Sequence, residues 1–141
     1  MDKILIPVDG SEVALHAVQY VIEQNRRGQL DAIFLINVQP GILSGDVKRF
    51  ISQDIIDAYQ REEGEKALAA AKALLDSEGL AYTARTLVGH IAESIISFAQ
   101  SQQCSSIVMG GRGLGSVMGM LLGSITTKVL VLSEVPVTVV K

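Results

Sequence analysis

Short apolar runs alternate with longer amphipathic stretches along the whole chain, and this alternation constrains the fold more than any other feature. The runs at residues 3–8, 31–38 and 105–110 are nearly continuous in aliphatic residues, which is typical of strands buried on both faces. A more polar run at residues 80–88, expected nearer a sheet edge, and a final run at residues 136–140 complete five predicted strands. Because helical patterns separate these strands, the sequence predicts an α/β fold, with a parallel sheet, right-handed crossovers and helices on both faces.

The stretches between the runs carry apolar residues at helical spacing. The predicted helices span residues 12–25, 52–78, 91–102 and 123–133. Gly28 and Gly79 follow the first two and are expected to end them, while Asp9 and Ser11 both qualify as the N-cap of the first. The stretch 40–51 shows no period, so we expect an irregular surface excursion there.

Composition narrows the class of protein. A length of 141 residues is typical of one domain, so residues 1–141 are predicted to form a single domain, and a hydrophobic content of 48% is ample for a core. A net charge of −3 argues against a basic face and hence against nucleic-acid binding. The single cysteine, Cys104, excludes an intrachain disulfide and is expected to pack in the core. No signal peptide or membrane-spanning run is present in the sequence, so we expect a cytoplasmic protein without membrane contact.

A glycine-rich segment directly follows the predicted strand at residues 105–110. It begins as Gly110-Gly111-Arg112-Gly113 and, after nine residues, leads through Gly123-Ser124 into the last predicted helix. Backbone without Cβ atoms can approach a ligand closely, and the amides and dipole of a helix start favour anions. Hydroxyl groups of Ser124, Thr126 and Thr127 are expected to add hydrogen-bond donors. The segment therefore predicts a cradle for the phosphates of a nucleotide, although a tight turn that binds no ligand would also explain the glycines.

The ends of the strands at 3–8, 31–38 and 105–110 lie close to this segment if the strands at 3–8 and 105–110 are neighbours. In open α/β sheets, ligands bind beyond the carboxyl ends of the strands, where the strand order reverses. Val38 and Met109 would then form the walls of an adenine pocket, and Asp9 would lie near the glycines. A carboxylate beside phosphate is unfavourable unless a divalent cation lies between them or the carboxylate binds a hydroxyl instead. The capping role of Asp9 remains an alternative.

The pattern G-x2-G-x9-G-S at Gly110, Gly113, Gly123 and Ser124 resembles that of the ATP-binding universal stress proteins. The resemblance also includes the opening Ile-Leu-Ile-Pro-Val-Asp-Gly-Ser of residues 4–11, Gly89-x5-Ile95 and the closing run of residues 135–140. It implies a five-stranded parallel sheet of order 3-2-1-4-5.

The resemblance also implies ligands and contacts for individual positions. The implied nucleotide is ATP, with Mg²⁺ or Mn²⁺ on the triphosphate and Asp9 as the protein group near the metal. The implied binding residues are Pro7, Val8 and Asp9 beside the nucleotide, Val38 at adenine, Met109 and Gly110 near base and ribose, and Arg112, Gly113, Gly123, Ser124, Ile125 and Thr126 around the phosphates. The resemblance further implies a homodimer that pairs its last strands at residues 136–140.

The sequence departs from the family pattern at one place and leaves two alternative functions open. The spacer at residues 114–122 carries no charge, whereas many family members place basic residues there. The sequence favours an ATP-binding regulatory protein of the stress response; a slow ATPase or phosphotransferase on the same site and a nucleotide-free dimeric scaffold are the alternatives. His16, His90 and Lys128 are expected to be surface or packing residues and not ligands.

Overall fold

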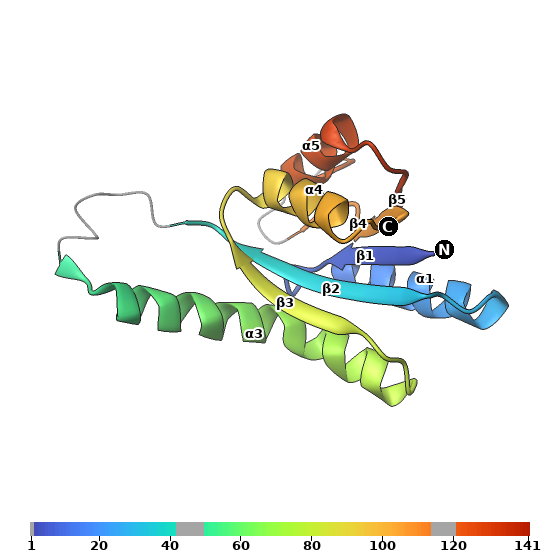
Figure 1. The fold of residues 1–141 in the computed structure, drawn as a ribbon, viewed down its shortest axis with the longest axis horizontal. Coiled ribbons are helices and arrows are strands. Elements are labelled where there is room, and N and C mark those ends of the chain that lie inside the picture. Colours follow the sequence, from blue (N-terminus) through green and yellow to red (C-terminus); the bar gives the residue numbers. More distant parts are fainter. Residues whose placement is uncertain (1, 42–49, 114–120) are drawn as a thin grey trace.

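The structure, a computed structural model, describes residues 2–41, 50–113 and 121–141. One sheet in the order β3-β2-β1-β4-β5 organises the chain (Figure 1). Its strands are β1 (Lys3–Pro7), β2 (Ala32–Gln39), β3 (Thr83–Val88), β4 (Ser106–Gly110) and β5 (Val137–Val140). Every neighbouring pair is parallel. The expected order 3-2-1-4-5 and the edge position of the third strand are confirmed.

Helices cover both faces of this sheet (Figure 1). They are α1 (Glu12–Arg27), α3 (Gln53–Ser77), α4 (Ile91–Ser101) and α5 (Ser124–Leu132). Side chains of α1 and α3 join one core cluster, and side chains of α4 and α5 join a second cluster on the opposite face. The structure therefore confirms the predicted α/β architecture.

Each core consists mainly of aliphatic side chains, and strand alternation divides β2 between them. Leu35 is fully buried against the α1/α3 face and Ile36 against the α4/α5 face. The second face also holds an edge-to-face pair of Phe34 and Phe98, with ring centroids 5.6 Å apart. Cys104 packs in this second core as expected, and burial raises the pKa of its thiol.

Local hydrogen bonds define where the helices begin and end. The Ser11 hydroxyl accepts a bond from the amide of Ala14 at 3.2 Å, so Ser11 and not Asp9 is the N-cap of α1. The C-cap of α1 is Gly28, as expected. The predicted strand at 80–88 begins too early, because the amide of Leu80 donates to the carbonyl of Leu75 at 3.1 Å and completes the end of α3. The strand therefore begins only at Thr83.

Two predictions fall partly on residues that the structure does not describe. Residues 42–49 contain most of the expected surface excursion at 40–51, and residues 114–120 contain most of the uncharged spacer. Within the described part of the chain, no helix has both the length and the apolar character that a membrane crossing requires.

Candidate functional site

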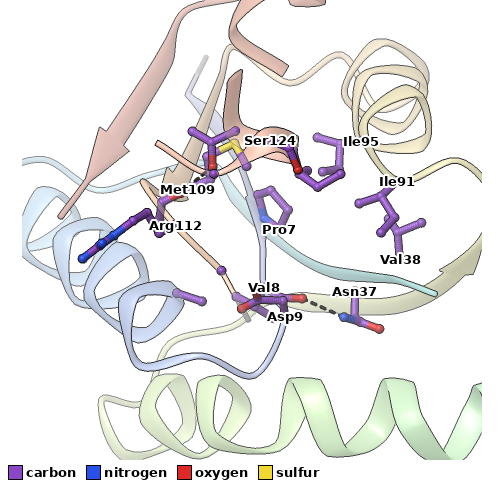
Figure 2. Close-up of a pocket in the computed structure, with 16 residues that line it drawn as sticks. Pro7, Val8, Asp9, Asn37, Val38, Ile91, Ile95, Met109, Arg112 and Ser124 are labelled. Carbon is purple, nitrogen blue, oxygen red and sulfur yellow. Dashed lines mark hydrogen bonds between the residues drawn. The ribbon is translucent and has the colours of Figure 1, made fainter. Parts of the chain in front are cut away.

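A cavity of about 390 Å³ lies at the carboxyl ends of β1, β2 and β4 (Figure 2). Strands β1 and β4 are neighbours, and the strand order reverses between them, because β1 is followed by β2 on one side and β4 by β5 on the other. The cavity lies within the range of volumes typical of small-molecule sites. All twelve residues predicted from the sequence line it, namely Pro7, Val8, Asp9, Val38, Met109, Gly110, Arg112, Gly113, Gly123, Ser124, Ile125 and Thr126. Their role in binding remains a prediction.

One wall of the cavity is apolar. Val38 and Met109 reach it from β2 and β4, and Ile91 and Ile95 reach it from α4 (Figure 2). Val38, Ile95 and Met109 also belong to the core of the α4/α5 face, which holds them rigidly. This wall suits a flat apolar group such as a nucleobase.

The opposite wall is backbone from the glycine-rich segment. A Cβ on Gly110 would lie 2.8 Å from Cγ1 of Val13 and 3.0 Å from its carbonyl carbon, so only glycine allows α1 to approach β4 this closely. The amide of Gly111 donates to Val140 at 2.8 Å, and the amide of Gly123 donates to Gly111 at 2.8 Å. Both ends of the segment are thereby anchored next to the cavity.

The start of α5 completes this wall. Gly123 is the N-cap and makes no side-chain capping hydrogen bond, and the first amide that bonds back into the helix is that of Thr127, to Gly123 at 3.0 Å. The amides of Ser124, Ile125 and Thr126 precede this bond, as in the first turn of any helix, and all three residues line the cavity. An anion placed here would meet amide donors and the positive end of the helix dipole.

The structure corrects the expectation for two hydroxyl donors. Thr126 is 3% exposed, and its hydroxyl donates to the carbonyl of Gly110 at 2.9 Å. The hydroxyl of Thr127 donates to the carbonyl of Gly123 at 3.0 Å. Both protons are therefore bound within the fold, because each hydroxyl lies next to a carbonyl of the glycine-rich segment. Thr126 thus fastens α5 to β4, and Ser124 remains the candidate donor.

Asp9 and Arg112 are the two charged residues of the lining. The Oδ1 atom of Asp9 accepts a bond from the amide of Ser11 at 3.0 Å, and Oδ2 lies so close to Gly113 that a Cβ there would collide with it. The exposed side chain of Arg112 extends toward α1, away from Val38 and the apolar wall (Figure 2). The carboxylate, and not the guanidinium, is thus the charge that lies against the cavity's glycine wall.

A metal ion would need ligands from outside the protein at this position. Among residues 2–41, 50–113 and 121–141, no group of three His, Cys, Asp or Glu side chains could hold one. Asp9 could contribute one oxygen ligand, with phosphate and water supplying the rest, which is the usual arrangement for Mg²⁺. The donor set therefore fits a cation that arrives with a phosphate group.

Four lining residues were missed from the sequence: Ala14, Asn37, Ile91 and Ile95. The three apolar ones carry no signal, because apolar residues at helical spacing predict any core equally well. Asn37 does carry one, since it is the one polar side chain within the apolar run at residues 31–38 after its first residue.

Other polar residues singled out in the sequence are not among those that line this cavity. Lys128 forms an ion pair with Glu93 across α5 and α4 at 2.5 Å, and this contact holds the pKa of Glu93 below its usual range. His16 lies on α1 with its Nδ1 atom 2.9 Å from the carbonyl oxygen of Lys141. His90 is the N-cap residue of α4. Neither histidine lines the cavity described above.

Comparison with known proteins gives one consistent result. The profile described as "Universal stress protein family" matches residues 1–141. Universal stress protein MJ0531 of Methanocaldococcus jannaschii is 32% identical over 141 residues, which cover 99% of this chain and 81% of that protein. The solved structure of the hypothetical protein MJ0577 is 28% identical with a TM-score of 0.84, covering 99% of this chain and 95% of that one. The universal stress protein of Archaeoglobus fulgidus, solved in complex with dAMP, shares the fold with a TM-score of 0.70 at 23% identity, covering 100% of this chain and 98% of that one.

Proposed function

The chain belongs to the universal stress protein family, and from that premise we propose that it binds an adenine nucleotide, ATP in particular. The ligand would occupy the cavity at the carboxyl ends of β1, β2 and β4, and its presence or absence would be the regulatory signal in a stress response. The observation that carries the proposal is the cavity itself, in which an apolar wall faces a backbone wall with a helix start.

The two walls suggest how the ligand is oriented. The base would lie against Val38, Met109 and Ile91, where apolar side chains remove it from water. The phosphates would lie along Gly113 and the first turn of α5, where amides favour anions. The dAMP complex of the Archaeoglobus fulgidus relative supports an adenine nucleotide as the class of ligand.

The triphosphate and its cation are the finer part of the proposal. Mg²⁺ or Mn²⁺ bound to the phosphates would also meet Asp9, and the cation would relieve the repulsion between two negative groups. We infer that ATP is bound and not rapidly hydrolysed, because hydrolysis needs a positioned water and a stabiliser of the developing charge. The exposed side chain of Arg112 extends toward α1, away from Ser124 at the start of α5 (Figure 2), and would have to turn to stabilise charge on a phosphate there.

A homodimer through β5 is the second part of the proposal. The carbonyl of Pro136 accepts a bond from Ile107 of β4, and that of Val140 accepts one from Gly111 just after β4. By the two-residue period, the main-chain groups of Val137 and Val139 therefore face the open edge. An unpaired apolar edge is a risk for aggregation, and pairing with a second copy removes it. Light scattering should show a dimer, and Val139→Pro, which deletes an outward N–H group, should yield monomer. A monomeric wild-type protein would contradict the dimer without affecting the nucleotide site.

Substitution of Gly113 tests the nucleotide site. A side chain there would meet the Asp9 carboxylate, a movable group, so Gly113→Val should fold but should lose ATP affinity by at least about tenfold as its side chain fills the phosphate position. Isothermal titration with Mg-ATP measures the effect. Gly28→Val is the matched control, because nothing lies within 4 Å of a Cβ built there. Unaltered binding by Gly113→Val would refute the assignment of this wall.

Nucleotide retained from purification separates the alternatives. Denatured protein should release ATP into the supernatant. Release of ADP, with phosphate appearing over hours, would favour the slow ATPase, while no nucleotide and no thermal shift with Mg-ATP would favour the scaffold.

A further inference from the structure

A buried side-chain amide joins the ends of β1 and β2 beside the cavity. Asn37 is 4% exposed, and its Nδ2 atom donates to the carbonyl of Val8 at 2.8 Å (Figure 2). Its Oδ1 atom accepts from Nε2 of Gln39 at 2.7 Å. Buried polar groups are costly unless they are bonded, so these two bonds account for a polar residue inside an apolar strand.

The Val8 carbonyl determines which way the Asn37 amide points, and Gln39 supports that orientation. The carbonyl of Val8 can only accept, so the NH₂ group of Asn37 must face it, and the oxygen of Asn37 is left to accept from the NH₂ group of Gln39. Gln39 is itself held by its main chain, which accepts a bond from the amide of Gly89 at 3.0 Å. The side-chain amide of Asn37 is thus held at both ends, by the carbonyl of Val8 and by the side chain of Gln39.

The bond to Val8 acts on the peptide that leads into Asp9. Strand β1 ends at Pro7, and Val8 is held to β2 by its own amide, which donates to Ile36 at 2.8 Å, and by Asn37 at its carbonyl. The carbonyl of Val8 and the amide of Asp9 belong to one planar unit. Asn37 therefore fixes the plane from which the Asp9 side chain departs.

The side chain of Asp9 connects this peptide to the glycine wall. Its Oδ1 atom is bonded to the amide of Ser11, and its Oδ2 atom lies against Gly113. A small rotation of the peptide before Asp9 would move the carboxylate relative to the predicted phosphate position. Binding geometry of this kind is sensitive to displacements of about 1 Å.

We propose that Asn37 is a positioning residue for nucleotide binding, which acts by orienting the peptide of Asp9, and that Gln39 holds Asn37 in the working orientation. The inference rests on the proposed function and deepens it, because it assigns a part in ligand binding to a buried residue of β2 that acts on the glycine wall through Asp9. Asn37 does not need to touch the ligand for this role.

A double-mutant cycle with Asp9 tests the inference. Asn37→Leu keeps the approximate size but leaves the Val8 carbonyl without its donor, and we expect a loss of about tenfold in Mg-ATP affinity. Asp9→Asn should reduce affinity to a similar extent. Because Asn37 acts through Asp9, adding Asn37→Leu to Asp9→Asn should cost less than about twofold more, whereas independent effects would multiply. Thermal unfolding reports how much of each change is loss of stability.

Substitutions of Gln39 provide a second test in which Asn37 itself is intact. Gln39→Met removes the donor to the Asn37 oxygen, and Gln39→Glu places acceptor-only oxygens against it, which favours a turned amide that cannot donate to Val8. Affinity should fall in the order wild type, Gln39→Met, Gln39→Glu, and thermal unfolding measures the accompanying loss of stability, because each variant leaves the buried oxygen of Asn37 without its donor. Gln19→Met, at an exposed position of α1 outside the cavity lining, is the control and should bind like wild type.

The outcomes separate this inference from the proposed function. Multiplicative losses in the cycle, or an Asp9→Asn variant that binds like wild type, would overturn the positioning role while nucleotide binding stands. Equal affinities of the two Gln39 variants and wild type would overturn the part assigned to Gln39. If the wild-type protein bound no adenine nucleotide at all, the proposed function and this inference would fail together.

Discussion

The two faces of the sheet are built from the same kinds of side chain, yet among the described residues the apolar wall of the cavity comes from one of them, the α4/α5 face. On the α1/α3 face, the 25-residue helix α3 runs along β2 and β3 and past their carboxyl ends (Figure 1). On the α4/α5 face the helices have only 11 and 9 residues, and Gly123 and Ser124 stand at the start of α5. The cavity thus lies where the helices are short and small residues begin a helix, although the two faces are similarly hydrophobic.

Consequently, a given substitution should have different effects on the two faces. Apart from Val8 and Ala14, the buried side chains of the α1/α3 face, which we call the closed face, lie outside the cavity lining, so their loss is measured as stability alone. Residues such as Val38 and Met109 belong both to the core and to the cavity wall, so their substitution should affect the ligand as well.

The largest effect on stability is expected for a deletion in the closed face. Leu75 is fully buried there, and Leu75→Ala should lower the free energy of unfolding by about 3 kcal/mol, because it removes apolar contact and leaves a cavity. Denaturation in urea measures the loss. Ile55→Ala on the same helix is the control, since Ile55 is 62% exposed and its loss should change stability by less than about 0.5 kcal/mol. A small effect of Leu75→Ala would mean that this face is less tightly packed than described.

The next largest effect is expected when a valine on each face is replaced by the larger phenylalanine, because the two variants should differ in stability. Val18→Phe adds a ring to the closed face and should cost about 1–3 kcal/mol of stability through overpacking. Val38→Phe can direct the ring into the cavity, so it should be much better tolerated but should block nucleotide binding. Unfolding curves and titration with Mg-ATP, applied to both variants, test the pair. Equal destabilisation by the two substitutions would contradict the difference between the faces.

The smallest effect on stability is expected for the ion pair between Glu93 of α4 and Lys128 of α5. Lys128 holds the pKa of Glu93 below its usual range, so Glu93 stabilises the fold when it is ionised. This contribution should be complete above the ordinary glutamate pKa, about 4.3, and should vanish as the pH falls through the lower folded value. The difference in melting temperature between wild type and Glu93→Gln should therefore be small at neutral pH, smaller in high salt, and absent in acid. A difference that persisted in acid would show that the charge of Glu93 is not its cause.

The sequence was a good guide wherever one local pattern had one structural meaning. Continuous aliphatic runs predicted the buried strands, and Gly28 predicted the end of α1. It was wrong about the start of the third strand, because whether Leu80 extends a helix end or begins a strand depends on its bond to Leu75. It was also wrong about the hydroxyls of Thr126 and Thr127, whose acceptors are carbonyls of the glycine-rich segment.

In the candidate site, too, the sequence predicted some features and not others. The positions of the strand ends predicted that Asp9, Val38 and Met109 meet the glycine-rich segment, because carboxyl ends of parallel strands meet at one edge. The full set of twelve residues that line the cavity came from the resemblance to the universal stress proteins. The direction of Arg112 away from the apolar wall and the contact of Asp9 with Gly113 could not be predicted in this way. Those depend on side-chain rotamers, which neighbours in space select.

By itself, the sequence determined the sheet, its covering helices and the edge at which a ligand should bind, since periodicity and glycine placement are properties of the chain. Only the tertiary structure decided that Ser11 caps α1, that Thr126 fastens α5 to β4, and that Asn37 orients the peptide before Asp9. The physical reason is that a hydrogen bond of a polar side chain is defined by which partner the fold places within 3 Å or so, and residues such as Asn37 and Val8 are far apart in sequence.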